Sequence, residues 1–286
     1  MHRVDDMTSG RARPVDRLFA LYAFLSGLSL LFPHRPSVWP LLAAIHLFVV
    51  AACLGWLPGR PWRSPAWLRE LYPVLVVPLL YAELPLLNKA VWDGHYFDDA
   101  IIAIEGVLFA GQPSREWAAA LPNVPLSEIL HASYLSYYFL IFVPPVYLWL
   151  RRPSATRAAV FALMLTFFAH YLFFVYFPVQ GPRYLFPPPG GAIADGFFYQ
   201  LAHRALEAGS SQGAAFPSSH VALGVAQSIV AWRWMPRGAL LVTLLTIGLA
   251  LGAIYGGFHY AFDALAGALL GTFTTLLAFR IEPAAD

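Results

Sequence analysis

Charged residues and cysteines are both scarce in this sequence. Only 12% of its 286 residues are Asp, Glu, Lys or Arg, whereas 59% are hydrophobic and 16% are aromatic. An ordinary soluble domain has roughly 25% charged residues. The composition therefore excludes a typical soluble domain and indicates an integral membrane protein. The single cysteine, Cys53, excludes an intrachain disulfide and says nothing about the redox compartment.

Alternating strand patterns, internal repeats and two common hydrolase motifs are also missing from the sequence. A lipid-facing strand alternates over about ten residues, so the continuously apolar runs found here exclude a β-barrel and predict an all-α bundle. The absence of His-Glu-x-x-His and Gly-x-Ser-x-Gly argues against other kinds of intramembrane hydrolase. Nothing in the sequence indicates nucleic-acid binding.

Long apolar runs are abundant. A helix needs about 17 to 25 apolar residues to cross a bilayer. We expect about eight spans, near 18–33, 37–57, 71–87, 128–150, 157–177, 218–234, 238–256 and 259–279. The first run is read as a retained span, because no small-residue cleavage site follows it. The chain is predicted to be one membrane domain, 1–286, in which 1–70 supply a tail and two accessory spans and 71–280 form the core.

The distribution of arginines predicts the topology. Arginines cluster before the first run and after the second, fourth and sixth runs, which the positive-inside rule assigns to the cytoplasm. The alternate segments 88–127 and 178–217 are rich in carboxylates or poor in bases. We therefore expect both termini in the cytoplasm, most simply of a bacterial inner membrane.

With this topology, four polar residues fall on the extracytoplasmic face. Arg183 follows the fifth run, His220 opens the sixth, and His259 and Asp263 open the eighth. His220 and His259 are one helical hairpin apart, which returns the chain to the same depth. We expect these side chains to converge.

His259 and Asp263 are four residues apart and share one face of a helix. The carboxylate can hold the imidazole Nδ1–H and leave Nε2 free to attack an electrophile. An ionisable residue inside an apolar helix usually marks function. The alternative is an interhelical polar clamp without catalytic function.

His220 and Arg183 have similar alternatives. His220 is either a boundary residue, with Ser218 or Ser219 as N-cap, or part of an anion site, since helix N-termini attract phosphate. The two helix starts at 218 and 259 outline such a phosphate cradle. Arg183 is either a snorkelling interfacial arginine or a planar fork that binds two phosphate oxygens.

The motifs resemble those of the type 2 phosphatidic acid phosphatase superfamily. "PSSH" at 217–220 is similar to its Pro-Ser-Gly-His motif, and His259-x-x-x-Asp263 is similar to the end of its Ser-Arg-x5-His-x3-Asp motif. The resemblance covers about 95–279 and implies a six-span core that acts on lipid phosphates without a metal or other cofactor.

The sequence also departs from that pattern. It has no Lys-x6-Arg-Pro motif, Ser219 replaces the usual glycine, and Gly252-Ala253 stand where Ser-Arg is expected. His-Tyr-x-x-Asp at 259–263, the Pro-Arg segment before "PSSH", "ILHASYLSYYFLIFVPPVYL" and "VLFAGQPSREW" are more similar to the inositol phosphorylceramide synthase-like branch.

Carried over by this resemblance, His259 is the nucleophile that forms a phosphohistidine, Asp263 orients it, and His220 protonates the leaving oxygen. By position we add candidate substrate-binding residues: Arg183, Tyr184, Ser218, Ser219 and Tyr255. Water as acceptor makes the protein a phosphatase, and a lipid or polyol hydroxyl makes it a transferase.

Two other readings remain open. A transporter could use the His-Asp pair for protons or substrate, although it would place polar groups near mid-membrane and show repeat symmetry. His220, His259 and Asp263 could also be three zinc ligands, although no glutamate lies nearby in the sequence to act as base. His46, His131 and His170 are interpreted as structural or interfacial.

Overall fold

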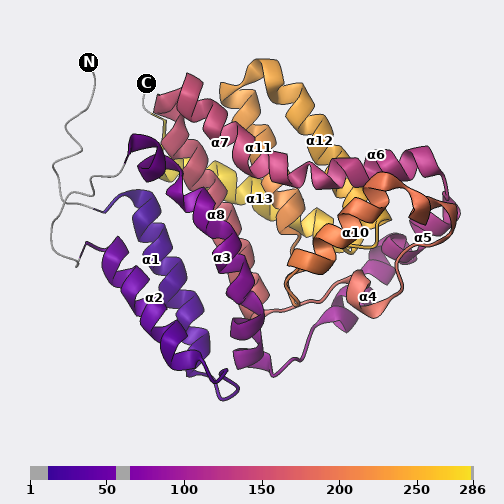
Figure 1. Ribbon diagram of the computed structural model, residues 1–286, viewed down its shortest axis with the longest axis horizontal. Coiled ribbons are helices and arrows are strands. Elements are labelled where there is room, and N and C mark those ends of the chain that lie inside the picture. The colour runs from indigo at the N-terminus through magenta and orange to yellow at the C-terminus, as the bar shows by residue number, and fades with distance from the viewer. Residues whose placement is uncertain (1–11, 56–64, 285–286) are drawn as a thin grey trace.

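The protein is a bundle of helices, and no β-strand forms in the residues that the structure describes, 12–55 and 65–284. We describe it from a computed structural model. An all-helical fold is therefore confirmed. The N-terminal part contains α1 (Pro14–Gly27), which continues as a short 3-10 helix (Leu28–Leu31), then α2 (Trp39–Cys53) and α3 (Ala66–Trp92). In Figure 1 the α1–α2 pair lies at the left of the bundle and packs beside α3 and α8.

The central part of the bundle consists of long apolar helices. They are α7 (Tyr137–Arg151), α8 (Pro153–Tyr176), α11 (Ser219–Trp234), α12 (Pro236–Tyr255) and α13 (Ala261–Ile281). Among the candidate membrane spans α8 is the most buried; its Phe168 and Tyr171 pack against Tyr22 of α1, and Phe167 packs against Tyr171. α11 packs against α7, α8, α12 and α13, so its start is held from several sides.

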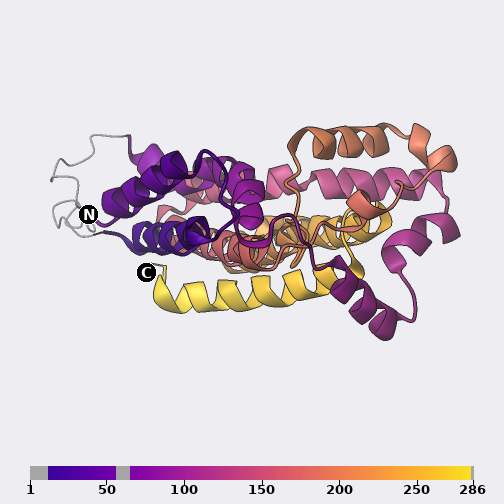
Figure 2. The ribbon, with the colours of Figure 1, turned by 90° about the horizontal axis from the view of Figure 1, so that it is seen from below.

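Shorter elements gather at one end of the molecule, which we call the site end. They are α4 (Asp98–Phe109), α5 (Pro113–Ala120), α9 (Pro182–Leu185), a 3-10 turn (Gly191–Asp195) and α10 (Phe197–Gly209). Figure 2 shows these elements at the right, while α13 runs from there to the C-terminus at the opposite end. α6 (Val124–Leu135) extends toward the site end and packs against α10 and α12.

Five helices are long and apolar enough to cross a membrane, and six if the bent α6–α7 pair counts as one span. Each of the eight runs expected from the sequence overlaps a helix, but α2 has 15 residues and α11 has 16. At about 1.5 Å per residue these two are short for a hydrocarbon core of roughly 30 Å. Eight spans therefore stay a prediction.

The fourth expected run is bent. α6 and α7 meet at Ser136 with an angle of 43°. Ser136 Oγ donates to the Ser133 carbonyl at 2.6 Å, a local bond of the type that bends helices. The prolines within α3 (Pro73, Pro78 and Pro85) do not end that helix, because neighbouring helices compensate for lost backbone bonds in a membrane bundle.

Candidate active site

His259 lies in a short turn between α12 and α13. The amides of Phe258 and His259 both donate to the Ala253 carbonyl, at 2.9 and 3.0 Å, and Gly257 adopts φ +68° to make the turn. One turn later, Asp263 accepts the Tyr260 amide at 2.9 Å and is fully buried. Asp263 Oδ2 is 3.5 Å from His259 Nδ1, which has no hydrogen-bond partner among the described residues. The imidazole therefore faces its carboxylate at a distance that a small closure would turn into a hydrogen bond.

His220 meets His259 from the first turn of α11. Its Nδ1 lies 3.3 Å from His259 Nε2, and its Nε2 lies 3.3 Å from the Tyr134 hydroxyl of α6. The rings of Tyr134 and Tyr137 flank the imidazole, with centroids 5.3 and 4.1 Å away. One proton arrangement satisfies the whole series: Tyr134 donates to His220, His220 Nδ1–H donates to His259 Nε2, and His259 Nδ1–H faces Asp263. The structure thus brings His220, His259 and Asp263 together.

Close backbone packing holds these two helix starts together. The Ser218 amide donates to the Asp263 carbonyl at 3.0 Å, and Ser218 Oγ caps α11 by accepting the Val221 amide at 3.4 Å. A Cβ on Gly267 would lie 2.3 Å from the Ser218 carbonyl oxygen, so only glycine permits this approach. Ser218 and Ser219 are both buried at this junction.

The two helix N-termini differ in how their amides are used. At α13 the amides of Ala261 and Phe262 donate to the Glu105 carboxylate, and the Tyr260 amide donates to Asp263. At α11 the amides of Ser219 and His220 have no acceptor in the described part of the chain. The expected cradle from both helix starts is therefore wrong for α13, because protein carboxylates already occupy its N-terminus. The start of α11 alone keeps free donors for an anion.

Arg183 and Tyr184 lie in the loop that follows α8. The loop runs beside the segment before "PSSH". The Val179 amide donates to the Gly213 carbonyl at 3.2 Å, and the Val179 carbonyl accepts the Ala215 amide at 2.9 Å. The Arg183 guanidinium and the Tyr184 hydroxyl both bond to Ser210 Oγ, each at 2.8 Å. Arg183 is half-buried and does not bond directly to His220 or His259.

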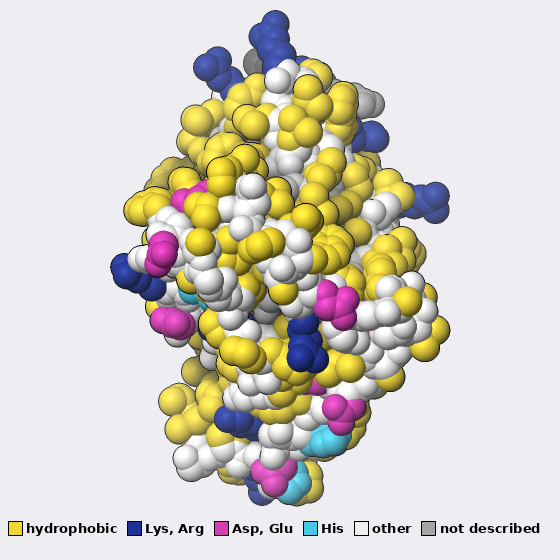
Figure 3. All heavy atoms as spheres, turned by 90° about the vertical axis from the view of Figure 1, so that its right-hand side faces the viewer, with side chains coloured by type: hydrophobic (Ala, Val, Ile, Leu, Met, Phe, Trp, Pro, Cys, Tyr) yellow, Lys and Arg dark blue, Asp and Glu magenta, His cyan; other side chains and the backbone are white. Residues whose placement is uncertain are grey.

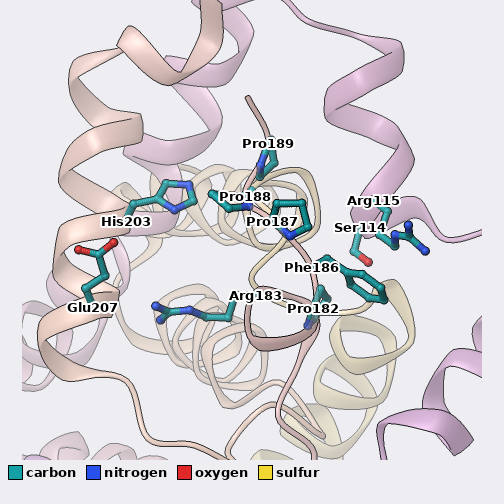
Figure 4. A pocket seen from close by; sticks show the side chains of 12 residues that line it. Ser114, Arg115, Pro182, Arg183, Phe186, Pro187, Pro188, Pro189, His203 and Glu207 are labelled. Carbon is teal, nitrogen blue, oxygen red and sulfur yellow. The ribbon is translucent and has the colours of Figure 1, made fainter. Parts of the chain in front are cut away.

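A cavity of about 330 Å³ lies against this loop at the site end. Figure 4 shows Arg183 extending toward α10, which carries His203 and Glu207, while Ser114 and Arg115 of α5 lie across the proline-rich loop. The cavity also reaches Gly256 and Gly257, which precede His259. The surface of this end mixes charged and histidine side chains with apolar ones (Figure 3).

The cavity is lined by two arginines (Arg115 and Arg183), by the acidic side chain of Glu207 and by neutral polar groups. Burial, together with the nearby His131 and Arg183, lowers the pKa of His203 to about 4, so this imidazole is neutral near pH 7. Ser114 Oγ is buried and has no hydrogen-bond partner within the described residues. Because two arginines outnumber one glutamate, the lining suits an anionic group with further oxygens that accept and donate hydrogen bonds.

Tyr255 is placed differently from the other candidate residues. Its hydroxyl donates to the Leu121 carbonyl at 2.7 Å, toward the α5–α6 connection, and its side chain is buried. The histidines interpreted as structural each bond through Nδ1 to a backbone carbonyl of their own helix, at 2.9, 2.7 and 2.7 Å for His46, His131 and His170. Within 12–55 and 65–284, no three His, Cys, Asp or Glu side chains are grouped as a metal ion would require.

Three site residues escaped the sequence analysis. Tyr134 bonds to His220, Asp98 of α4 bonds to the segment that leads into Arg183, and Glu105 of α4 bonds to the first amides of α13. Asp98 and Glu105 are two buried carboxylates in a mostly apolar segment, seven residues apart, and this spacing on one helix face was the available signal. Tyr134 offered no comparable signal among several neighbouring tyrosines.

Comparison with known proteins gives one result. A family model described as the PAP2 superfamily matches residues 94–277, which include the loop of Arg183, the start of α11 and the start of α13. No curated protein and no solved structure matches the chain.

Proposed function

Because the chain belongs to the PAP2 superfamily, we propose that it is a membrane-embedded enzyme that cleaves a lipid phosphate ester through a covalent phosphohistidine at His259. Membership indicates a phosphatase-type activity on lipid phosphates. The observation that carries the proposal is the position of His259, whose Nε2 is 3.3 Å from His220 Nδ1 and whose Nδ1 is 3.5 Å from Asp263.

In the proposed first step, the Nε2 lone pair of His259 attacks phosphorus. A P–N bond forms, the P–O bond to the leaving group breaks, and the leaving oxygen takes a proton from His220 Nδ1. A bound phosphate separates the two imidazoles, and its negative charge favours the protonated form of His220 that this step needs. Asp263 balances the positive charge that develops on His259.

In the second step the acceptor oxygen attacks phosphorus and gives its proton to His220, while the P–N bond breaks. The phosphate oxygens would be bound by the free amides of Ser219 and His220 and by Arg183. Tyr184 and Ser218 would support these contacts. Tyr255 would take part only after its hydroxyl left the Leu121 carbonyl.

The proposal also concerns the molecule that receives the phosphoryl-containing group. We propose a transferase of the inositol phosphorylceramide synthase-like kind, which passes the phosphoryl-containing group to a lipid hydroxyl. The cavity beside Arg183 supports this: its volume of about 330 Å³ can hold a polar headgroup, and its lining includes Gly256 and Gly257, which lie just before His259 in the chain. The arginines that precede the first apolar run and follow the second, fourth and sixth support cytoplasmic termini in a bacterial inner membrane, with the site on the extracytoplasmic face.

The test is turnover of a panel of lipids by the purified protein. Phosphatidate, an isoprenoid diphosphate and phosphatidylinositol would each be supplied with and without ceramide or diacylglycerol. We expect one of them to lose its phosphoryl group, and His259→Ala, His220→Ala and Asp263→Asn to lower that rate by about 10³-fold or more. His95→Ala is the matched control, because this histidine is exposed at the site end.

If all three variants turn over the lipid at the wild-type rate, the assignment is refuted. Transport of a solute that depends on His259, with no lipid turnover in the wild type, would instead support a transporter. Loss of activity with a chelator would favour the metal-dependent alternative.

A further inference from the structure

α4 presents two carboxylates to the interior and apolar side chains to the outside. Asp98 and Glu105 are seven residues apart on one helix face and are 4% and 0% exposed. Val107 and Leu108, by contrast, are 85% and 54% exposed. Burying two carboxyl groups on a short helix is costly unless they are hydrogen-bonded, so their partners are informative.

Asp98 bonds to the loop that carries Arg183. Its two carboxylate oxygens accept the amides of Gln180 and Gly181, each at 2.9 Å. The same carboxylate accepts the Tyr260 hydroxyl at 3.1 Å. One end of α4 is thereby bonded both to the turn before Arg183 and to the residue after His259.

Glu105 bonds to the helix that carries Asp263. Its Oε1 accepts the amides of Ala261 and, at 3.4 Å, of Phe262, which are the first amides of α13. Glu105 joins segments 156 residues apart in the sequence and fixes the first turn of α13.

The second oxygen of Glu105 has a different environment. Glu105 Oε2 is buried without a hydrogen-bond partner among the described residues, and so is Asp263 Oδ1. Burial is the main cause that raises the pKa of Glu105 to about 7, and the negative charges of Asp263 and Glu116 add to it. A proton on Oε2 removes the like-charge repulsion with Asp263 and leaves Oε1 to accept the two amides.

We propose that Glu105 is a positioning residue, which sets the first turn of α13 through its hydrogen bonds and so orients Asp263 against His259. It does not touch the substrate. Its importance for catalysis rests on the proposed function, but its effect on His259 does not.

The direct test is a ¹⁵N-imidazole NMR titration of the full-length protein in detergent micelles, with His259→Ala used to assign the signal. We expect Glu105→Ala to lower the His259 pKa by about one unit, because Asp263 then stabilises the imidazolium less well. Glu105→Gln keeps an acceptor for the amides and a donor in place of the protonated oxygen, and it should restore the wild-type titration to within a few tenths of a unit.

Two outcomes would overturn the proposal. In the first, His259 of the Ala variant titrates as in the wild type. In the second, the His259 pKa of the Gln variant shifts as far as that of the Ala variant, which would mean that the charge of Glu105, and not its hydrogen bonding, acts on His259. If Glu105→Ala does not fold, Glu105→Asp replaces it, since its carboxylate is one methylene too short to reach both amides. The Asp variant should then shift and the Gln variant should not.

Turnover gives a second readout. We expect Glu105→Ala to lower kcat by about 10²-fold with little change in KM, as small misplacements of reacting groups do. Glu105→Gln should recover most of this loss, and Asp99→Asn, at an exposed carboxylate of the same helix, should behave as the wild type. Equal losses in kcat and thermal stability for Ala and Gln would contradict a positioning role. Absence of any lipid turnover in the wild type would refute the proposed function but leave the titration result intact.

Discussion

At the scale of single residues, the position of His259 depends more on neighbouring hydrogen-bonding groups than on fixed charges. His259 faces a histidine on one side and a carboxylate on the other, at 3.3 and 3.5 Å. In the proposed mechanism the phosphate is bound by the charged guanidinium of Arg183 and by the uncharged amide donors at the start of α11. His203, which lines the adjoining cavity, is neutral near pH 7 and adds no charge of its own.

His203 gives a prediction about stability and pH. Its pKa is lowered to about 4 in the folded protein, while the unfolded chain keeps the ordinary value near 6.5. Between these values the unfolded chain binds a proton that the folded protein does not, so the contribution of His203 to stability falls as pH decreases from 6.5 to 4. Thermal unfolding in detergent should show a smaller loss of Tm over this range in His203→Gln than in the wild type. Parallel pH dependence in both proteins would contradict this.

At the scale of elements, the site depends on the contact between α11 and α13. Gly267 of α13 lies against the backbone of Ser218, and Gly271 lies against the backbone of Ala222. Small residues at such positions let membrane helices approach closely. The approach brings His220, on α11, to His259, at the start of α13.

Gly267→Ala should therefore separate the two helices. A Cβ at 2.3 Å from the Ser218 carbonyl oxygen forces a backbone shift, and we expect a loss of about 1 to 3 kcal/mol in stability and a larger relative loss of turnover. Gly238→Ala is the control, because a Cβ at that glycine of α12 meets nothing within 4 Å. Its Tm should stay the same or rise slightly. A Gly267→Ala protein as stable and active as the control would show that the close contact is not required.

The sequence predicts the site through local spacing but not through distant contacts. His259 and Asp263 are four residues apart, and one hairpin separates His220 from His259, so helix geometry was enough to expect their convergence. The Glu105 bond to Ala261 spans 156 residues, and no local pattern indicates it. For that reason the start of α13 was expected to bind phosphate, although its amides are already bonded to protein carboxylates. The sequence gives no signal for the bend at Ser136, because this residue lies within a continuous apolar run.

At the scale of the whole molecule, the site end and the C-terminal end of α13 lie at opposite ends of the bundle (Figure 2). Five or six of the described helices are long and apolar enough to cross a membrane. The number of membrane crossings can therefore be measured directly. The arginine distribution predicts that the C-terminal end is cytoplasmic and the site end is not.

Single-cysteine labelling tests this orientation. In a Cys53→Ser background, Pro187→Cys lies at the exposed proline-rich loop of the site end and Pro283→Cys lies just after α13. In intact bacterial cells, a membrane-impermeant maleimide should label the first and leave the second unlabelled until the membrane is opened. The reverse pattern, or labelling of both in intact cells, would contradict the predicted topology.

The central claim is that His259 becomes covalently bonded to phosphorus during turnover. The most direct measurement is peptide mass spectrometry of the protein mixed with its lipid substrate and quenched at alkaline pH. We predict an adduct on the peptide that contains His259, absent from His259→Ala, with a mass that distinguishes a bare phosphoryl group from one that carries a headgroup. Turnover with an adduct on another residue, or undiminished turnover by His259→Ala, would contradict the account.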